Sequence, residues 1–269
     1  VNGVFENYQT LDGSTLFLGA FFFTIQIYGD FSGYSDIAIG CARLFGIDLM
    51  QNFKYPYFSR DIAEFWRRWH ISLTTWFRDY IYIPLGGSRA GKWKSFRNTL
   101  VIFLVSGFWH GANWTFVAWG AYHALLFLPL LLLGQNRRYR DSVAENSFLP
   151  SVKELTQMGV TFLLVLLGWI LFRSEDISQA AVYLERMFNA SLFSAPQLVG
   201  LGFGQLLLKK CFFFTALMFV VEWIGRKQAH GLMIEDLSLP VRYVIYTVLL
   251  IIIYGFDASN PQGFIYFQF

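Results

Sequence analysis

Long runs of apolar residues, separated by short polar segments, cover most of the chain. Several runs are shorter than the ~20 residues that a simple helix needs to cross the hydrocarbon core of a bilayer. Such runs can form tilted, broken or re-entrant helices, whose backbone groups are satisfied inside the protein. The runs are Ser14–Tyr28, which Gln26 interrupts, then Asn98–Trp109, Asn113–Gly134, Leu155–Phe172, Cys211–Ile224 with an apolar lead-in from Leu206, and Val241–Phe256. The pattern predicts an all-α, polytopic membrane protein.

The polar segments between these runs predict the loops. Gln135–Pro150 is the clearest loop, and residues 174–204 form the next, with a short amphipathic helix expected at Ile177–Met187. Asn260–Gly263 predicts a turn before an aromatic tail at Phe264–Phe269. The chain contains neither an internal repeat nor a low-complexity linker, so we expect a single membrane domain over residues 1–269.

The segment Phe65–Tyr80 has the pattern of an amphipathic helix. At about 100° per residue, its apolar side chains fall on one face and its charged side chains on the other. The apolar face contains Trp66, Trp69, Leu73, Trp76, Phe77 and Tyr80, with His70 among them, and the opposite face contains Arg67, Arg68, Arg78 and Asp79. The pattern predicts one helix at the membrane interface, with its histidine buried in an aromatic stripe.

Composition agrees with a membrane protein. Hydrophobic residues make up 55% of the chain and charged residues 14%, whereas about a quarter of the residues in a soluble domain are charged. The two cysteines, Cys41 and Cys211, lie in apolar surroundings and have no disulfide or zinc spacing. We therefore expect both to be small core residues.

Positive charge is concentrated in residues 54–97, which contain nine basic and three acidic residues. This balance of +6 compares with +3 for the whole chain, so the remainder is net negative. By the positive-inside rule, the basic segment faces the cytoplasm. The mildly basic loop after Gly134 would face the same side if the chain turns near Gly111. The positive charge can attract anionic lipid headgroups. It would equally attract a negatively charged acyl donor.

His110 is an ionisable residue between two apolar stretches that the sequence predicts to lie in the membrane. The residues from Asn98 to Trp109 and from Asn113 to Gly134 carry no charge. A helix that starts near Asn98 would advance roughly 18 Å before it reaches His110, well inside the membrane. Ionisable residues at such depth are costly and face a protein interior or a wet cavity, so a functional site is the default interpretation.

The four histidines differ in their sequence contexts. His230 lies in a polar loop and is expected to be solvated, while His123 in an apolar helix is expected to be a hydrogen-bonded core residue. His70 and His110 lie in dense aromatic contexts. Burial in an apolar cavity lowers the pKa of a histidine, so it stays neutral and can accept a proton from an attacking hydroxyl. A buried histidine that only caps a helix break is the alternative for His110.

Other catalytic signatures are absent from the sequence. It contains no Gly-x-Ser-x-Gly elbow, no cysteine–histidine nucleophile pair and no His-Glu-x-x-His metal helix. Pro84–Arg89 lacks the lysine and hydroxyl ending of a phosphate loop, so we interpret it as a turn.

Four ordered motifs occupy the first half of the chain. They are residues 28–40 (YGDFSGYSDIAIG), 65–73 (FWRRWHISL), 82–87 (YIPLGG) and 109–114 (WHGANW). In this order they resemble the membrane-bound O-acyltransferase (MBOAT) family, in the bacterial alginate O-acetyltransferase-like branch, and the aromatic tail is similar as well. The resemblance implies a funnel of helices. His110 matches the histidine on the funnel floor, and His70 matches the second histidine of the bacterial branch.

The resemblance also assigns neighbouring residues. We expect Trp66, Trp69, Trp109 and Asn113, which stand beside the two histidines, to bind substrate. Asp30 and Asp36 belong to the first motif and are expected to be structural, bonded to helix ends or to the tyrosines. Family members are longer at the N-terminus, which implies that this chain is a C-terminal fragment.

The activity implied by the resemblance is O-acyl transfer in the bacterial inner membrane, by a multi-pass protein. An acetyl group would move from a cytoplasmic thioester, acetyl-CoA or an acyl-carrier protein, toward an extracytoplasmic polysaccharide hydroxyl. Transfer would be direct or through a periplasmic acetyltransferase partner. The donor would be a co-substrate, with no bound cofactor, metal or nucleic acid.

Two other functions stay open from the sequence. D-alanyl transfer from a carrier protein to teichoic acid is the nearest rival, because that branch shares both histidines. A non-enzymatic channel or transporter, in which His70 and His110 relay protons, is the other. It predicts charged residues along several helices and duplicated broken helices, and the sequence has neither.

Overall fold

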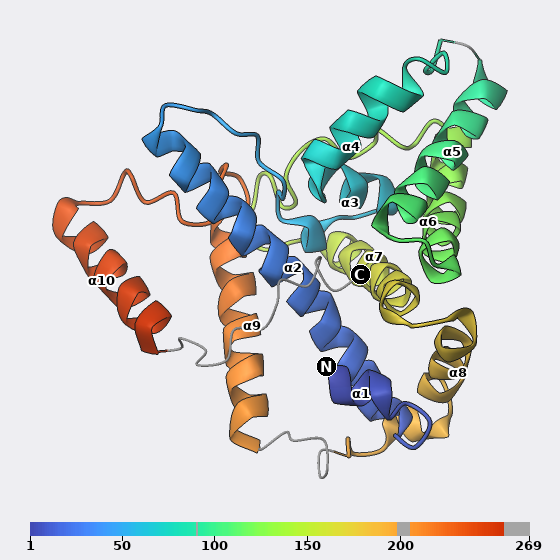
Figure 1. Ribbon diagram of the computed structural model, residues 1–269. Helices are drawn as coiled ribbons and strands as arrows, with labels where there is room; N and C mark the ends of the chain where they lie inside the picture. Colours follow the sequence, from blue (N-terminus) through green and yellow to red (C-terminus); the bar gives the residue numbers. More distant parts are fainter. Residues whose placement is uncertain (90, 198–204, 256–269) are drawn as a thin grey trace.

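The computed structural model describes residues 1–89, 91–197 and 205–255, and these residues form helices with no β-strand (Figure 1). The α-helices are α1 (Asn2–Glu6), α2 (Gly13–Leu44), α3 (Ile62–Arg68), α4 (Ile71–Phe77), α5 (Lys92–His110), α6 (Trp114–Leu132), α7 (Val152–Arg173), α8 (Ile177–Met187), α9 (Gln205–Gly225) and α10 (Leu239–Gly255). Short 3-10 turns lie at Pro56–Phe58 and Ala190–Phe193, and a π-helical turn, η2, lies at Arg78–Tyr82. The all-α prediction is confirmed.

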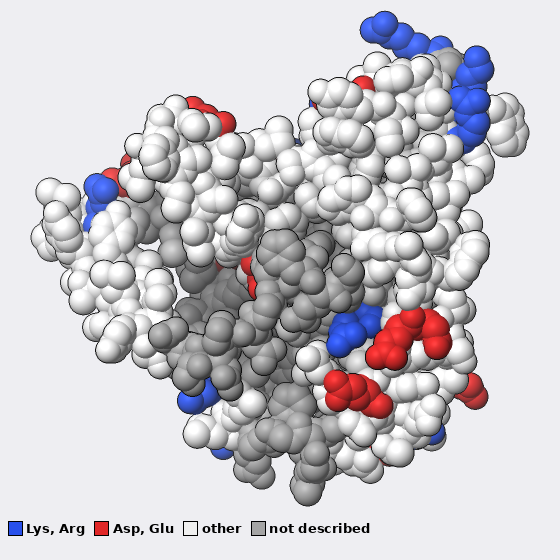
Figure 2. All heavy atoms as spheres, viewed as in Figure 1, with Lys and Arg blue, Asp and Glu red and all other residues white. Residues whose placement is uncertain are grey.

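Two of the described helices, α6 and α7, are long and apolar enough to cross a bilayer. Large apolar side chains are also exposed on other helices, including Leu250 and Ile251 on α10 and Phe213 on α9. Figure 2 shows one face on which most side chains are uncharged, with lysine and arginine gathered where α5 begins. An extensive exposed apolar surface is typical of a protein that contacts lipid or a partner.

Local signals placed several helix boundaries. The predicted helix at Ile177–Met187 is α8, and its N-cap Asp176 accepts a hydrogen bond from the backbone N–H of Gln179 at 2.7 Å. A reciprocal capping box between Ser151 and Glu154 starts α7. The predicted loop 135–150 contains no helix. The predicted turn at 260–263 and tail at 264–269 lie outside the described residues.

Three expectations about helices and burial need correction. The apolar run from Ser14 is only the first half of α2, which continues to Leu44. α5 begins at Lys92 rather than near Asn98. His110 therefore lies roughly 27 Å along the helix, at its far end. Cys41 is exposed and Cys211 only partly buried, because the second half of α2 carries few buried residues.

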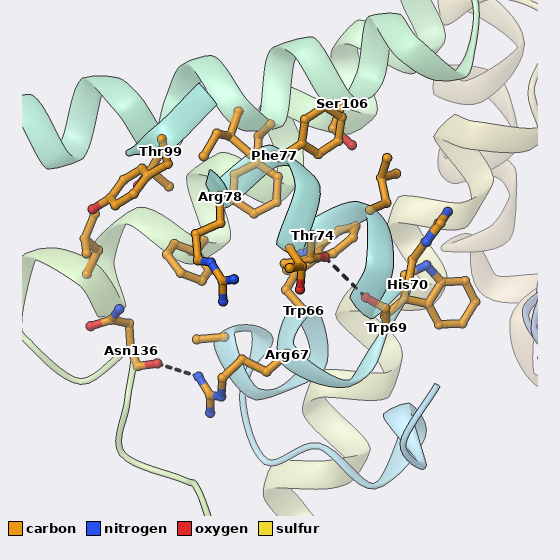
Figure 3. Close-up of a pocket in the computed structure, with 18 of the residues that line it drawn as sticks. Trp66, Arg67, Trp69, His70, Thr74, Phe77, Arg78, Thr99, Ser106 and Asn136 are labelled. Atoms are coloured by element: carbon orange, nitrogen blue, oxygen red, sulfur yellow. Dashed lines mark hydrogen bonds between the residues drawn. The ribbon is translucent and has the colours of Figure 1, made fainter. Parts of the chain in front are cut away.

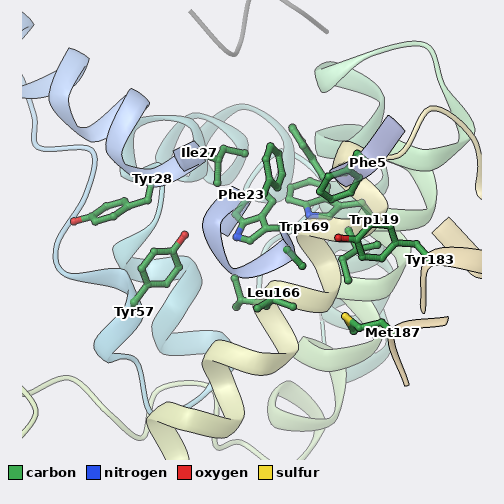
Figure 4. Close-up of a cluster of buried hydrophobic side chains, with 14 of the residues drawn as sticks. Phe5, Phe23, Ile27, Tyr28, Tyr57, Trp119, Leu166, Trp169, Tyr183 and Met187 are labelled. Atoms are coloured by element: carbon green, nitrogen blue, oxygen red, sulfur yellow. The ribbon is translucent and has the colours of Figure 1, made fainter. Parts of the chain in front are cut away.

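The core is a cluster of aromatic and aliphatic side chains where α2, α3, α6, α7 and α8 meet (Figure 4). Trp69, Trp119 and Trp169 are almost completely buried in it. Tyr183 of α8 stacks on Phe5 at 4.6 Å and donates a hydrogen bond to the Leu16 carbonyl at 2.7 Å. These contacts hold α8 against α1 and the first half of α2.

Two glycines let α5 and α6 form a tight antiparallel pair. A Cβ atom on Gly107 would lie 2.2 Å from the Phe116 carbonyl oxygen, and one on Gly120 would lie 2.2 Å from the Phe103 carbonyl oxygen. Any larger residue at either position would force the backbones apart. The close approach brings His110, at the end of α5, against side chains of α6.

The expectation of one helix over Phe65–Tyr80 is wrong. The helix breaks at His70, whose backbone is left-handed (φ 44°, ψ 55°), and α4 restarts at Ile71. The loop before α3 stabilises the break. The N–H of Ile71 donates to the Asn52 carbonyl at 2.9 Å, and the N–H of Lys54 donates to the Arg68 carbonyl at 3.0 Å.

Packing explains why the helix does not continue. Trp69 is buried between Phe53 of the loop and Trp169 of α7, at 5.0 Å from each ring. Trp76 and Tyr80, on the same face of the projected helix, are 50% and 67% exposed. A straight helix would have placed all three on one buried stripe, so the break separates the buried part from the exposed part.

Candidate active site

A cavity of about 350 Å³ lies between α3, α4 and α5, with the end of α6 closing one side. Its wall is mostly aromatic and aliphatic, and a few polar side chains face it (Figure 3). His70 lies at one end of the view in Figure 3 and Asn136 at the other. Apolar cavities with a few placed polar groups are the usual form of small-molecule sites.

His110 lines this cavity from the last turn of α5. Its imidazole ring lies 4.9 Å from the Trp109 ring, 5.2 Å from the Trp119 ring and 5.0 Å from the Phe172 ring. The last two rings belong to α6 and α7, so helices distant in sequence position this histidine.

His70 lines the same cavity from the break between α3 and α4. Its ring lies 4.8 Å from Phe31 and 6.2 Å from Trp109, and its Nδ1 lies 3.5 Å from the Ser72 hydroxyl. Burial lowers the pKa of His70 to about 4, so the ring is neutral at physiological pH. The structure thus brings the two histidines to one cavity, with Trp109 in contact with both.

The other predicted site residues divide into two groups. Trp66 and Trp69 line the cavity. Trp109 is 54% exposed and does not line it. Asn113 caps α6 by accepting from the Thr115 N–H at 3.1 Å, and its side-chain amide donates to the Glu175 carbonyl at 2.7 Å. Both polar groups of Asn113 are therefore used within the protein.

The structure adds polar lining residues that the sequence did not single out. Thr74, Thr99 and Ser106 face the cavity from α4 and α5, and Arg67, Arg78 and Arg137 line it as well. Ser106, a polar residue in the uncharged stretch of α5 that leads to His110, is a sequence signal for such a role. The contribution of Arg137 had no local signal, because it depends on how the loop 135–150 folds back over α3.

A second cavity, of about 390 Å³, adjoins the first and shares Arg67 and Arg137 with it. We call it the basic cavity; it is lined by Lys54, Arg67, Arg68, Arg137 and Arg140, with Tyr139, Ser142, Glu64 and Asp141. Five cations and two carboxylates give it an excess of positive charge.

The two carboxylates of the basic cavity are already paired. Glu64 contacts Arg68 at 2.7 Å and Arg60 at 3.0 Å, and Asp141 contacts Arg60 at 3.2 Å. Among the described residues, Arg137 and Arg140 form no ion pair. The positive field of the cavity is therefore left for an anion, because such a field focuses in a cleft.

The remaining ionisable residues lie elsewhere. Asp30 and Asp36 lie inside α2 rather than at a helix end. His230 lies in the segment between α9 and α10 and is half-buried. His123 is completely buried, and neither of its ring nitrogens has a hydrogen-bond partner among the described residues. In the described part of the chain, no three His, Cys, Asp or Glu side chains are grouped to hold a metal ion.

Comparison with known proteins identifies relatives over the segment that forms both cavities. A sequence model described as MBOAT, membrane-bound O-acyltransferase family, matches residues 4–142. The "Probable alginate O-acetylase AlgI" of Pseudomonas aeruginosa is 43% identical over 196 residues, which are 71% of this chain and 36% of the relative. The chain thus spans about a third of the length of these curated relatives.

Two further relatives carry different names. The "Peptidoglycan O-acetyltransferase" of Helicobacter pylori is 40% identical over 165 residues, covering 61% of this chain and 30% of the relative. The "Teichoic acid D-alanyltransferase" of Bacillus subtilis is 30% identical over 163 residues, covering 57% of this chain and 40% of the relative.

Proposed function

The chain belongs to the membrane-bound O-acyltransferase family, and from this premise we propose that it transfers an acetyl group from a thioester donor to a polysaccharide hydroxyl. The observation that carries the proposal is the convergence of His70 and His110, 40 residues apart in sequence, on one apolar cavity. Relatives named for alginate and peptidoglycan O-acetylation support acetyl as the group and a polysaccharide as the acceptor.

The mechanism assigns His110 as the general base. Its neutral ring accepts the proton of the acceptor hydroxyl while the hydroxyl oxygen attacks the thioester carbonyl. The tetrahedral intermediate collapses with cleavage of the carbon–sulfur bond, and the proton passes to the leaving thiolate. His70 orients the substrate or holds a hydrogen bond, because it is fixed by the helix break and surrounded by aromatic rings.

The basic cavity supports a phosphate-bearing donor. Acetyl-CoA and an acyl-carrier protein both present a thioester on a phosphorylated arm, and guanidinium groups bind phosphate with charge-assisted hydrogen bonds. Because Arg67 and Arg137 line both cavities, an anion held there has its arm directed toward the histidines. The donor is a co-substrate in this proposal, not a bound cofactor.

Replacing Arg137 and Arg140 with glutamine together should raise the KM for the acyl donor about tenfold or more, because each charge-assisted contact contributes about 1.5–3 kcal/mol. The kcat at saturating donor should change much less, since neither side chain contacts the reacting atoms. Initial-rate assays in membranes at varied donor concentration measure both constants.

Arg138→Gln is the matched control, because Arg138 does not line the basic cavity and instead lies over the Tyr139 ring at 5.2 Å. It removes one positive charge from the same loop, and the single variants Arg137→Gln and Arg140→Gln are compared with it charge for charge. An equal rise in KM for this variant would mean that the loop acts through its overall charge, and the assignment of the cavity would be wrong.

We also propose that the chain is a multi-pass part of the bacterial inner membrane, with its helices arranged as a funnel around the cavity. The exposed apolar side chains of α9 and α10 support contact with lipid. The excess of positive charge in residues 54–97 supports a cytoplasmic location for the basic cavity.

This orientation predicts opposite labelling of two positions. In a background with Cys41 and Cys211 changed to serine, Ser194→Cys should react with an impermeant thiol reagent from outside, and Lys94→Cys should react only after permeabilisation. Lys94 suits this purpose because it is exposed, whereas its neighbour Ser95 is buried. Equal labelling of both positions from outside would refute the orientation.

The assay for the proposed function supplies membranes with labelled acetyl thioester and follows label into polysaccharide. A periplasmic acetyltransferase is the partner we expect if transfer to the final acceptor is indirect. Incorporation of D-alanine from a carrier thioester, with no acetyl incorporation, would instead favour the teichoic acid reaction named for the Bacillus subtilis relative.

A further inference from the structure

His123 is a fully buried histidine in the middle of α6, and the proposed acyl-transfer steps do not use it. Within the described part of the chain, neither its Nδ1 nor its Nε2 has a hydrogen-bond partner. Most buried polar atoms in proteins are paired, and an unpaired one is costly. An apolar residue at this position would avoid that cost, so the presence of a histidine here is not explained by stability.

The contacts of His123 connect it to the cavity wall through Trp66 and to His110 through Trp119. Its ring lies 5.0 Å from the Trp66 ring at an interplanar angle of 89°, and 5.0 Å from the Trp119 ring at 72°. Trp66 forms part of the cavity wall. Trp119 contacts His110 at 5.2 Å and 87°.

This geometry suits weak hydrogen bonds to aromatic faces. In edge-to-face pairs, the positive edge of one ring meets the negative face of the other, and an N–H of the imidazole or of an indole can be part of that edge. Such contacts orient the two indoles without a conventional acceptor. An aliphatic side chain of the same size would fill the space but would not set the orientation of either ring.

His123 also lies close to α7. A Cβ atom on Gly168 would lie 2.6 Å from the Nε2 of His123. The neighbouring Tyr122 hydroxyl donates to the Leu164 carbonyl at 2.9 Å, which ties the same turn of α6 to α7. The imidazole of α6 is therefore confined between Trp66 of α3 and Gly168 of α7.

We propose that His123 is a positioning residue, which holds Trp66 and Trp119 so that the cavity wall and the ring of His110 keep their relative orientation. This inference rests on the proposed role of His110 as general base. The chemistry of His123 acts through the two indoles, and the residue does not touch the reacting atoms.

The test compares two replacements in membranes from cells that express the protein. His123→Leu keeps a similar volume and removes both nitrogens, and should lower kcat by about 10- to 100-fold, since small misplacements far from the chemistry can have effects of that size. The KM for the donor should not rise, and the melting temperature should not fall. His123→Gln, which retains an N–H donor, should recover most of the lost kcat.

A second pair of variants approaches His123 from α7. Gly168→Ala should push the imidazole toward the tryptophans and lower kcat without raising the donor KM. Gly159→Ala on the same helix is its matched control, because a Cβ atom there meets no neighbouring atom within 4 Å. This pair keeps the proposal testable if the leucine variant does not fold.

A leucine variant with wild-type kcat would overturn the proposal. So would equal losses for His123→Leu and His123→Gln that follow the melting temperature, because a purely structural role predicts that pattern. Failure of the proposed function itself would look different, since His110→Ala would then acylate at the wild-type rate.

Discussion

Replacing His110 with alanine should abolish acyl transfer while the protein is expressed and unfolds at nearly the wild-type temperature. A general base contributes roughly 10²–10⁴-fold to a rate, and no other described side chain in the cavity is placed as His110 is, at the end of α5 against α6 and α7. Stability should be retained because the side chain lines a cavity rather than filling the core. Transfer of labelled acetyl to polysaccharide and thermal unfolding in detergent measure the two effects.

His70→Asn provides the comparison for this variant. Asparagine keeps a polar group at the helix break and also tolerates the left-handed backbone found there. Measurable transfer should therefore remain. A loss as complete as that of His110→Ala would refute the division of roles between the two histidines. Wild-type activity in His110→Ala would instead show that His110 is structural.

Replacing Glu64 with alanine should destabilise the protein by about 3–5 kcal/mol, the usual cost of leaving buried charges without their partner. Glu64 is 1% exposed and holds both Arg60 and Arg68. Arg60 also donates to the Asp141 carbonyl at 2.8 Å, which anchors the loop that lines the basic cavity. Thermal unfolding in detergent should show a large decrease in melting temperature.

Asp79→Asn is the matched control for Glu64. Its partner Arg78 lies at 2.7 Å, but the pair is solvent-exposed, and exposed pairs contribute little. The melting temperature of this variant should equal that of the wild type. A Glu64 variant that unfolds at the wild-type temperature would mean that the arginines find water or other partners, and the ion network would not anchor the loop.

The two histidines could be recognised as candidate site residues from the sequence, but the sequence did not show that they line one cavity. His70 and His110 stood out because each is a lone ionisable group in an apolar, aromatic context, and both matched ordered motifs. The expectation of one continuous helix through His70 was nevertheless wrong, since the break depends on two hydrogen bonds with a preceding loop. The Asn52 carbonyl accepts from the Ile71 N–H, and the Lys54 N–H donates to the Arg68 carbonyl. Trp109 and Asn113 were chosen as neighbours in sequence, and neither lines the cavity.

The sequence by itself determined the features that depend on neighbouring residues. Apolar runs set the all-α class, and the N-cap Asp176 and the Ser151–Glu154 capping box marked where α8 and α7 begin, because capping and periodicity act within a few turns. Only the tertiary structure decided the break at His70, the exposure of Cys41 and the basic cavity. These depend on contacts between segments far apart in the chain, such as Arg67 with the loop at Asn136, and no local pattern encodes which distant surfaces meet.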